Sequence, residues 1–283
     1  MKLSIRNTVF EVFQFLWDNR LDLVRMMAAP VVALSILGIG ISALFRDFDP
    51  AAEEASISGL QFVGLIIGLA LPMLFYVMFA VAWHRRCLRS EEQTTILTAL
   101  RWDRRKTLFL FRFIMISIIA GLSTLPILVI GGIVGATGAL GLGAAGGGGP
   151  NTPEQLIVFL NLILIFVFML VQVRLSLLLP ATAIDQKLTL AETWTIGRGN
   201  SWRLLSILLL SMAPAMLVLI VVGSAMGAIS QATGLGQAMT VEFVVRLVFN
   251  LAYYIVIAAS VSALSISYRE LRQTPSPGMP YQM

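Results

Sequence analysis

Residues 59–83 read GLQFVGLIIGLALPMLFYVMFAVAW, a run of 25 residues without a charged side chain. A helix of this length rises about 37 Å, and the hydrocarbon core of a bilayer is about 30 Å thick. Five other stretches pass the same test of length and apolar character. The six predicted spans are 26–45, 59–83, 113–134, 156–173, 204–223 and 243–268.

The composition of the whole chain agrees with a membrane protein. Of its 283 residues, 58% are apolar and 12% are charged, whereas soluble proteins carry about 25% charged residues. Too few polar side chains are present to cover a soluble core of this size. We therefore predict an all-α, polytopic membrane protein. Residues 1–272 are expected to form one six-helix domain, and residues 273–283, with three prolines, a disordered cytoplasmic tail.

Lysine and arginine in short loops set the orientation of a membrane protein, because they are retained in the cytoplasm. Of the 20 lysines and arginines, all but Arg46 and Arg246 fall in the segments that precede odd-numbered spans or follow even-numbered ones. This bias predicts that both termini face the cytoplasm and that the protein is a multi-pass protein of the bacterial inner membrane. Tryptophan prefers the headgroup layer, and all five tryptophans lie at the same predicted interface: Trp17, Trp83, Trp102, Trp194 and Trp202.

A similar short passage precedes each odd-numbered span. Thr8–Glu11, Ser90–Gln93 and Thr189–Glu192 each fit the S/T-x-x-E/Q capping box, which marks a helix start. An aromatic-basic cluster follows each box. The pattern predicts up to three interfacial helices on the cytoplasmic side. It has two interpretations, a true internal repeat or ordinary amphipathic linkers, and the sequence favours neither.

Three stretches carry a resemblance to a known family. They are RLSLLLPATAID at 174–185, the segment from Trp194 to Arg203 that contains GRGNSWR, and the closing YRELR at 268–272. In these the chain resembles six-span bacterial inner-membrane proteins related to the membrane domain of glycerophosphodiester phosphodiesterases. The resemblance implies a six-helix membrane domain in the inner membrane. It does not imply phosphodiesterase chemistry, because that chemistry resides in a separate soluble barrel for which this chain has no segment.

Ionisable groups within spans are functional candidates, because a charge in the bilayer costs about 2.5–3.5 kcal/mol at the centre. Glu242, Arg246 and Asn250 are spaced i, i+4, i+8 and share one face of the last span, while Asn161 and Gln172 share a face of the fourth. One interpretation is a self-paired stripe that faces the bundle. The other is the polar lining of a cavity or of a lipid-headgroup site.

The cations of the cytoplasmic side are the second candidate site. Beside a membrane, the nearest partner for basic side chains is anionic lipid, at about 1 kcal/mol for each cation, and no nucleic acid is expected. The predicted lipid-headgroup contacts are Arg85, Arg104, Arg105, Arg174, Arg203 and Arg269.

Other motifs carry little chemistry. Gly141–Gly146 fits G-x-G-x-x-G, but it lies in a glycine-rich loop and predicts a flexible connector rather than a dinucleotide site. His84 and Cys87 are the only histidine and the only cysteine, and two ligands do not complete a zinc site. Pro126 is expected to kink the third span. We expect no metal, no cofactor and no catalytic site.

The sequence therefore predicts a non-enzymatic integral membrane protein that acts as a lipid-interacting scaffold or accessory subunit through its basic cytoplasmic surface. The alternative is a transporter or channel for a small or lipidic substrate, which would use the polar faces of the fourth and sixth spans. A membrane-embedded enzyme is a third possibility that no motif of the sequence supports.

Overall fold

The computed structural model describes residues 2–46, 57–89, 99–129, 153–233 and 239–273. Within these ranges the regular structure is helical and contains no strand. The helices are α1 (Ile5–Asp18), α2 (Arg20–Leu44), α3 (Gly59–Leu88), α5 (Arg104–Leu122), α7 (Pro153–Leu175), α8 (Leu178–Ala183), α9 (Leu190–Ile196), α10 (Ser201–Thr233) and α11 (Met239–Gln273). The prediction of an all-α protein is confirmed. The glycine-rich loop and the tail after Gln273 lie outside the described residues.

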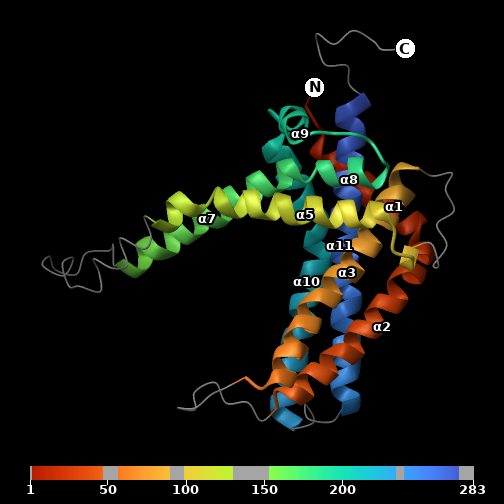
Figure 1. Ribbon diagram of the computed structural model, residues 1–283, viewed down its shortest axis with the longest axis vertical. Helices are drawn as coiled ribbons and strands as arrows, with labels where there is room; N and C mark the ends of the chain where they lie inside the picture. Colours follow the sequence, from red (N-terminus) through yellow and green to blue (C-terminus); the bar gives the residue numbers. More distant parts are fainter. Residues whose placement is uncertain (1, 47–56, 90–98, 130–152, 234–238, 274–283) are drawn as a thin grey trace, which may run out of the picture.

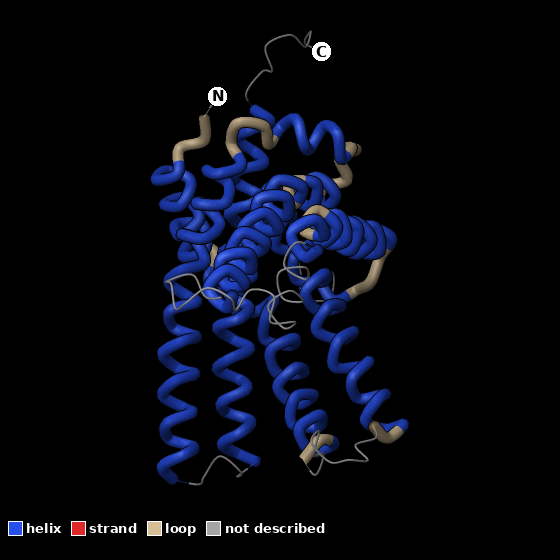
Figure 2. Tube along the Cα trace, turned by 90° about the vertical axis from the view of Figure 1, so that its left-hand side faces the viewer, coloured by secondary structure: helices blue, strands red, loops and turns tan. Residues whose placement is uncertain are grey.

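Four long helices form the main bundle. Helix α11 packs against α2, α3 and α10, and α2 also packs against α3. Figure 1 shows the start of α1 and the end of α11 at one end of this bundle, and Figure 2 shows the long helices running together away from that end. Gly64 and Gly68 of α3 lie against Leu44 and Ile41 of α2, with too little room for a Cβ, so small residues set this close approach.

Five helices of the described chain are long and apolar enough to cross a membrane. They correspond to the first, second, fourth, fifth and sixth predicted spans, and they support a multi-pass membrane protein. The structure moves several boundaries. Helix α10 continues from Ser201 to Thr233 and α11 from Met239 to Gln273, so both are longer than the apolar stretches that predicted them.

The third predicted span, 113–134, differs most from the structure. Helix α5 begins at Arg104 and ends at Leu122, and the hydroxyls of Ser123 and Thr124 donate to the carbonyls of Ala120 and Gly121. These local bonds compete with the helical ladder. A new helical turn begins after Thr124 and places Pro126 in its first turn, where no backbone donor is needed. Pro126 therefore follows a helix break instead of kinking a continuous span, and residues 130–134 are not described.

Helices α5 and α7 pack against each other and leave the bundle sideways, at a steep angle to the long helices (Figure 1). Helix α5 also contacts α3 and α8, and α7 contacts α10 and α9. Ring contacts anchor both helices to the bundle. Phe113 lies 5.1 Å from Tyr76 and Phe166 lies 4.8 Å from Trp202, between ring centroids. Away from these contacts the pair exposes large apolar side chains such as Phe111 and Phe159.

We call the end of the molecule that holds α1, α8, α9 and the adjoining ends of α3, α5 and α11 the collar. Its centre is the fully buried Trp83, which stacks on Phe79 at 5.9 Å and meets Phe15 edge-on at 5.4 Å. The indole nitrogen of Trp83 donates to Ser262 Oγ at 2.8 Å. The ring of Trp83 is therefore enclosed by protein, and its one donor is satisfied there. Its position at the cytoplasmic interface stays a prediction.

Only part of the predicted capping pattern is present. Thr189 and Glu192 form the reciprocal capping box at the start of α9. Thr8 does not cap a helix, because α1 already begins at Ile5 and the Thr8 hydroxyl donates to the carbonyl of Ser4. Ser90–Gln93 lies outside the described residues. A reciprocal box that the sequence analysis missed joins Ser58 and Gln61 at the start of α3.

Candidate functional site

Side chains from several helices meet at the turn at 182–186, which begins in the last residues of the short helix α8. Asp185 has a φ of +63°, a left-handed conformation in which aspartate is one of the few tolerated residues. This conformation ends α8 and presents the carbonyls of Ala183 and Ile184, together with the Asp185 carboxylate, to neighbouring helices. The turn therefore offers several acceptors to cations from other parts of the chain.

Arginines from two helices bind this turn. Arg85 of α3 donates to the carbonyl of Ala183 at 3.1 Å and to Asp185 Oδ2 at 3.3 Å. Arg89 donates to the carbonyl of Ile184 at 2.7 Å, and Arg105 of α5 donates through Nε to Asp185 Oδ1 at 2.7 Å. The two carboxylate oxygens thus join α3 to α5 through a single residue.

The electrostatics of Asp185 follow from this arrangement. Partial burial raises the pKa of its carboxyl, but the hydrogen bonds and positive charges of Arg105 and Arg85 outweigh burial and hold the pKa below its ordinary value. The side chain is 48% exposed, so solvent screens the ion pairs and each contributes under about 1 kcal/mol.

The neighbouring residues of the turn are also bound. Arg112 of α5 donates to the Thr182 hydroxyl at 2.7 Å. The hydroxyl of Tyr268 donates to Gln186 Oε1, and Arg272 donates to the same oxygen and to Tyr268 Oη. Helix α11 is thereby joined to the same turn as α3 and α5. In the sequence, Asp185 was noted only as the last residue of the family-like stretch 174–185. The signal that could have identified it as a partner for arginines is an aspartate directly after a short apolar segment.

The structure gives five of the six predicted headgroup arginines partners within the protein. Arg85 and Arg105 bind the turn, as described above. Arg174 donates to the carbonyl of Trp194 at 3.0 and 2.7 Å and stacks 3.7 Å from the centre of its ring. Arg203 donates to the carbonyl of Leu3, and Arg269 pairs with Glu11. Arg104 is exposed at the start of α5. Lipid contact by these six side chains stays a prediction.

The charged part of the predicted intramembrane stripe faces α2. Arg246 donates to Glu242 Oε1 at 3.0 Å through Nε and 2.8 Å through Nη2, and it also donates to the hydroxyl of Ser42. Its guanidinium lies where a Cβ on Gly38 would stand, 2.6 Å from that position. Gly38 therefore admits the side chain, and α2 supplies both the space and an acceptor.

Asn250, the third member of the stripe, is also bound to α2. Its Nδ2 donates to Ser35 Oγ at 3.0 Å, and Ser35 donates its own proton to the carbonyl of Val31 at 2.7 Å. The stripe of α11 thus matches Ser35, Gly38 and Ser42 of α2, which are spaced three and four apart. This row of small and polar residues on α2 could have identified α2 as the partner of the stripe, and it was not recognised in the sequence.

The structure does not bring the two polar residues of the fourth span to this stripe. Asn161 and Gln172 lie on α7, which packs against α5, α9 and α10. Asn161 is exposed, and Oε1 of Gln172 is buried without a hydrogen-bond partner in the described structure. The predicted shared lining from the fourth and sixth spans is therefore not seen in this arrangement.

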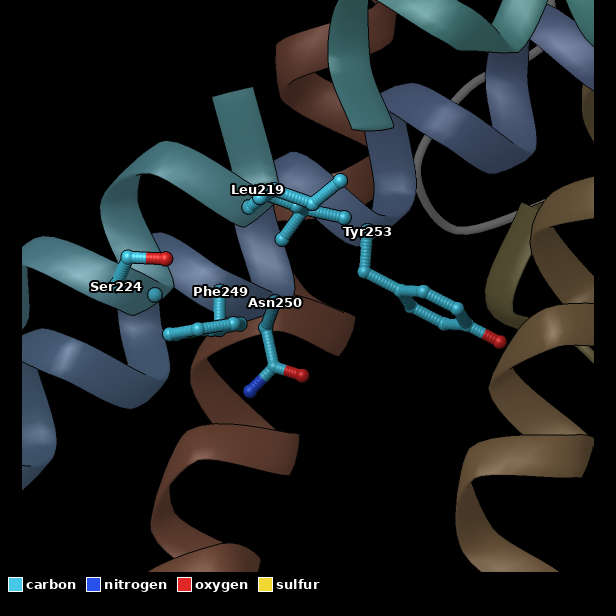
Figure 3. Close-up of a pocket in the computed structure, with 7 residues that line it drawn as sticks. Leu219, Ser224, Phe249, Asn250 and Tyr253 are labelled. Atoms are coloured by element: carbon cyan, nitrogen blue, oxygen red, sulfur yellow. The ribbon is translucent and has the colours of Figure 1, made fainter. Parts of the chain in front are cut away.

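A pocket of about 600 Å³ opens between α10 and α11 (Figure 3). Its wall on α10 includes Leu219, Gly223 and Ser224, and its wall on α11 consists of Phe249, Asn250 and Tyr253. A Cβ on Gly223 would stand 2.9 Å from the Phe249 ring, so glycine brings the two walls together. The only stripe residue that lines this pocket is Asn250.

His84 and Cys87 are buried in the collar. His84 Nδ1 lies 2.7 Å from Ser265 Oγ, and Ser265 Oγ lies 2.8 Å from the carbonyl oxygen of Val261. These contacts enclose the imidazole within the collar. The described residues contain no group of three or more His, Cys, Asp or Glu side chains placed to hold a metal.

Among known proteins, the chain matches no family model, no curated sequence and no solved structure.

Proposed function

We propose that this chain is a non-enzymatic, lipid-interacting scaffold or accessory subunit of the bacterial inner membrane, with six spans and both termini in the cytoplasm. The resemblance of its sequence to six-span inner-membrane proteins is part of the same proposal. Apart from Arg46 and Arg246, the cationic residues of the described chain lie at or near the collar, and the positive-inside bias assigns such an end to the cytoplasm.

One observation carries the proposal: the surface of α1 and the start of α2. An apolar stripe at helical spacing is exposed there, with Phe10 at 70%, Trp17 at 69% and Leu21 at 65%. Four cations are exposed along the same segment, namely Lys2, Arg6, Arg20 and Arg25. An amphipathic helix with exposed aromatics and flanking cations binds the surface of an anionic membrane.

This surface differs from the one that the sequence analysis proposed. Of the six arginines first assigned to lipid, Arg85 and Arg105 hold the turn at 182–186, which helps to make the collar a platform joined by several helices. Arg174, Arg203 and Arg269 bind other groups of the protein. The cations of α1 are closer to solvent. The proposed working surface is therefore α1 with the start of α2, supported by the collar beneath it.

Retention of phosphatidylglycerol by the full-length protein tests this surface. We expect Arg6→Gln combined with Arg20→Gln to weaken lipid binding in mild detergent about thirtyfold, because each of the two cations contributes about 1 kcal/mol. Arg46→Gln is the matched control, since Arg46 is exposed at the opposite end. Native mass spectrometry measures the bound lipid. Equal retention by the double variant and the control would contradict the proposal.

A second function, transport of a lipidic substrate, is favoured by one observation. Asn250 of the polar stripe lines a pocket between two candidate spans. Under this alternative, flux through reconstituted vesicles is lost in Asn250→Leu and in Arg246→Leu. Under the scaffold proposal, both variants leave lipid retention at α1 unchanged.

A further inference from the structure

The pocket between α10 and α11 has features of a ligand site that the scaffold proposal does not use. Its volume of about 600 Å³ falls in the range of small-molecule sites, about 300–1,000 Å³. Both of its walls belong to helices that are long and apolar enough to span a membrane. Such a pocket opens to lipid rather than to water, so its ligands reach it through the bilayer.

The depth of the pocket restricts its ligand. Asn250 lies seven residues after the start of the predicted span 243–268, about 10 Å along the helix axis. That places it inside a hydrocarbon layer about 30 Å thick. None of the residues described as lining the pocket is charged. A charged headgroup drawn to this depth would be unpaired and costly, so the lining favours an uncharged molecule.

The polar atoms of the pocket favour a hydroxyl group on that molecule. The amide nitrogen of Asn250 is used by Ser35, at 3.0 Å, which leaves the carbonyl oxygen of the same side chain as an acceptor. Tyr253 and Ser224 each carry a hydroxyl, and Tyr253 is 48% exposed. A purely hydrocarbon ligand would leave these groups unsatisfied in an apolar medium. A ligand hydroxyl can donate to the Asn250 carbonyl oxygen, whereas the Tyr253 hydroxyl points away from Asn250 (Figure 3).

The apolar walls accommodate the rest of such a ligand. Leu219 and Phe249 face the pocket, and Gly223 keeps the Phe249 ring close to α10. In Figure 3 the side chains of Leu219, Phe249, Asn250 and Tyr253 border one open space, and the Tyr253 ring extends away from α10. A single long chain can lie along the groove between the two helices with its hydroxyl at Asn250.

We propose that this pocket binds an uncharged, hydroxyl-bearing long-chain lipid, whose hydroxyl donates a hydrogen bond to the side-chain carbonyl oxygen of Asn250. The site lies on different helices from the α1 surface and does not depend on it. The inference requires only that α10 and α11 are embedded in lipid. It therefore stands or fails separately from the scaffold function.

Photo-crosslinking of the full-length protein in phosphatidylcholine vesicles tests the site. The probe is a 16-carbon alcohol that carries a diazirine, and the matched probe is its methyl ether. We expect the alcohol to label peptides that contain 219–224 and 249–253, and the ether to label them about three- to tenfold less, as expected for the loss of one hydrogen bond. Equal labelling by the two probes would overturn the proposed recognition of the hydroxyl.

Variants locate the site and separate its parts. Leu219→Trp fills the pocket and should abolish labelling, whereas Leu217→Trp, on the exposed face of the same helix, should not reduce it. Asn250→Leu removes the acceptor and should lower labelling by the alcohol to the level of the ether. Tyr253→Phe, whose lost hydroxyl points away from Asn250, should keep labelling by the alcohol within about twofold. Ser35→Ala, which removes the acceptor of the Asn250 amide nitrogen, should also keep it within about twofold. Equal labelling of the two tryptophan variants, or of Asn250→Leu and wild type, would refute the site.

Discussion

The collar and the far end of the bundle use polar side chains in different ways. At the collar, arginines from α3 and α5 converge on the turn at 182–186, and buried aromatic rings fill the space beneath. At the far end, one stripe on α11 meets one face of α2, and most other surfaces are exposed apolar side chains. Polar side chains at the collar therefore join several helices, whereas at the far end they join α11 to α2 and, through Gln61, α3 to α2.

This difference has a physical cause. Water can reach part of the collar, so its charged groups need only be partly enclosed, and they can serve as links between elements. In lipid, an unpaired charge is costly and apolar contacts gain little from leaving the solvent. The far end therefore keeps Arg246 of α11 within reach of Glu242 and Ser42. Three predictions examine this comparison, in order of decreasing effect.

The largest effect is expected for Trp83 of the collar. Trp83→Ala should lower the free energy of unfolding by about 3–5 kcal/mol, because it empties a fully buried site and leaves the Ser262 hydroxyl without its donor. Phe62→Ala on the same helix is the control. Phe62 is 59% exposed, so its loss should change the free energy by about 0.5 kcal/mol or less. Denaturant titration in detergent measures the free energy of unfolding of both variants. Similar losses of free energy in Trp83→Ala and Phe62→Ala would contradict the proposed difference in packing between the collar and the far end.

A smaller effect is expected for the ion pair of the far end. Arg246→Leu should cost about 1–3 kcal/mol, because Glu242 remains without its partner. The double variant Glu242→Leu, Arg246→Leu should recover most of this loss, since apolar residues can replace a paired charge. The same titration, carried out on both single variants and on the double variant, gives the coupling energy. Additive losses would mean that the two side chains do not interact in the membrane.

The smallest effect is expected for the ion pairs of the collar turn. The folded state lowers the pKa of Asp185 below its unfolded value, so its ion pairs contribute stability above the unfolded pKa, about 3.9, and lose it as pH falls through the folded pKa. Asp185→Asn should cost under about 1 kcal/mol at neutral pH. Between pH 6 and pH 3 the free energy of unfolding of the wild type should fall toward that of the variant. A constant difference between the two free energies over this range would show that the carboxylate charge does not stabilise the turn.

The apolar spans could be predicted from the sequence because length and composition are local properties. The test that found residues 59–83 also found the segments that became α2, α7, α10 and α11. The same test predicted one continuous span at 113–134, but the helix α5 ends at Leu122 although the apolar residues continue. Ser123 and Thr124 bond to their own backbone there, and a hydropathy average is insensitive to such bonds.

The candidate site was less accessible to sequence reasoning. The spacing of Glu242, Arg246 and Asn250 identified one face of a helix, because 3.6 residues per turn set that face. The spacing did not identify Ser35 and Gly38 as the opposite face, more than 200 positions away in the chain. The predicted headgroup arginines were recognised as cations, but their partners are backbone carbonyls and carboxylates from other elements.

The sequence by itself determined that this chain is helical and has several helices apolar enough for a membrane, because backbone groups in lipid must be satisfied within each helix. It also determined which residues share a helical face. The tertiary structure alone decided that Trp83 is enclosed by protein, that the turn at Asp185 joins three helices, and that Asn250 borders a pocket. Such contacts depend on which helix faces lie against each other, and that pairing is a property of packing in space rather than of spacing along one helix.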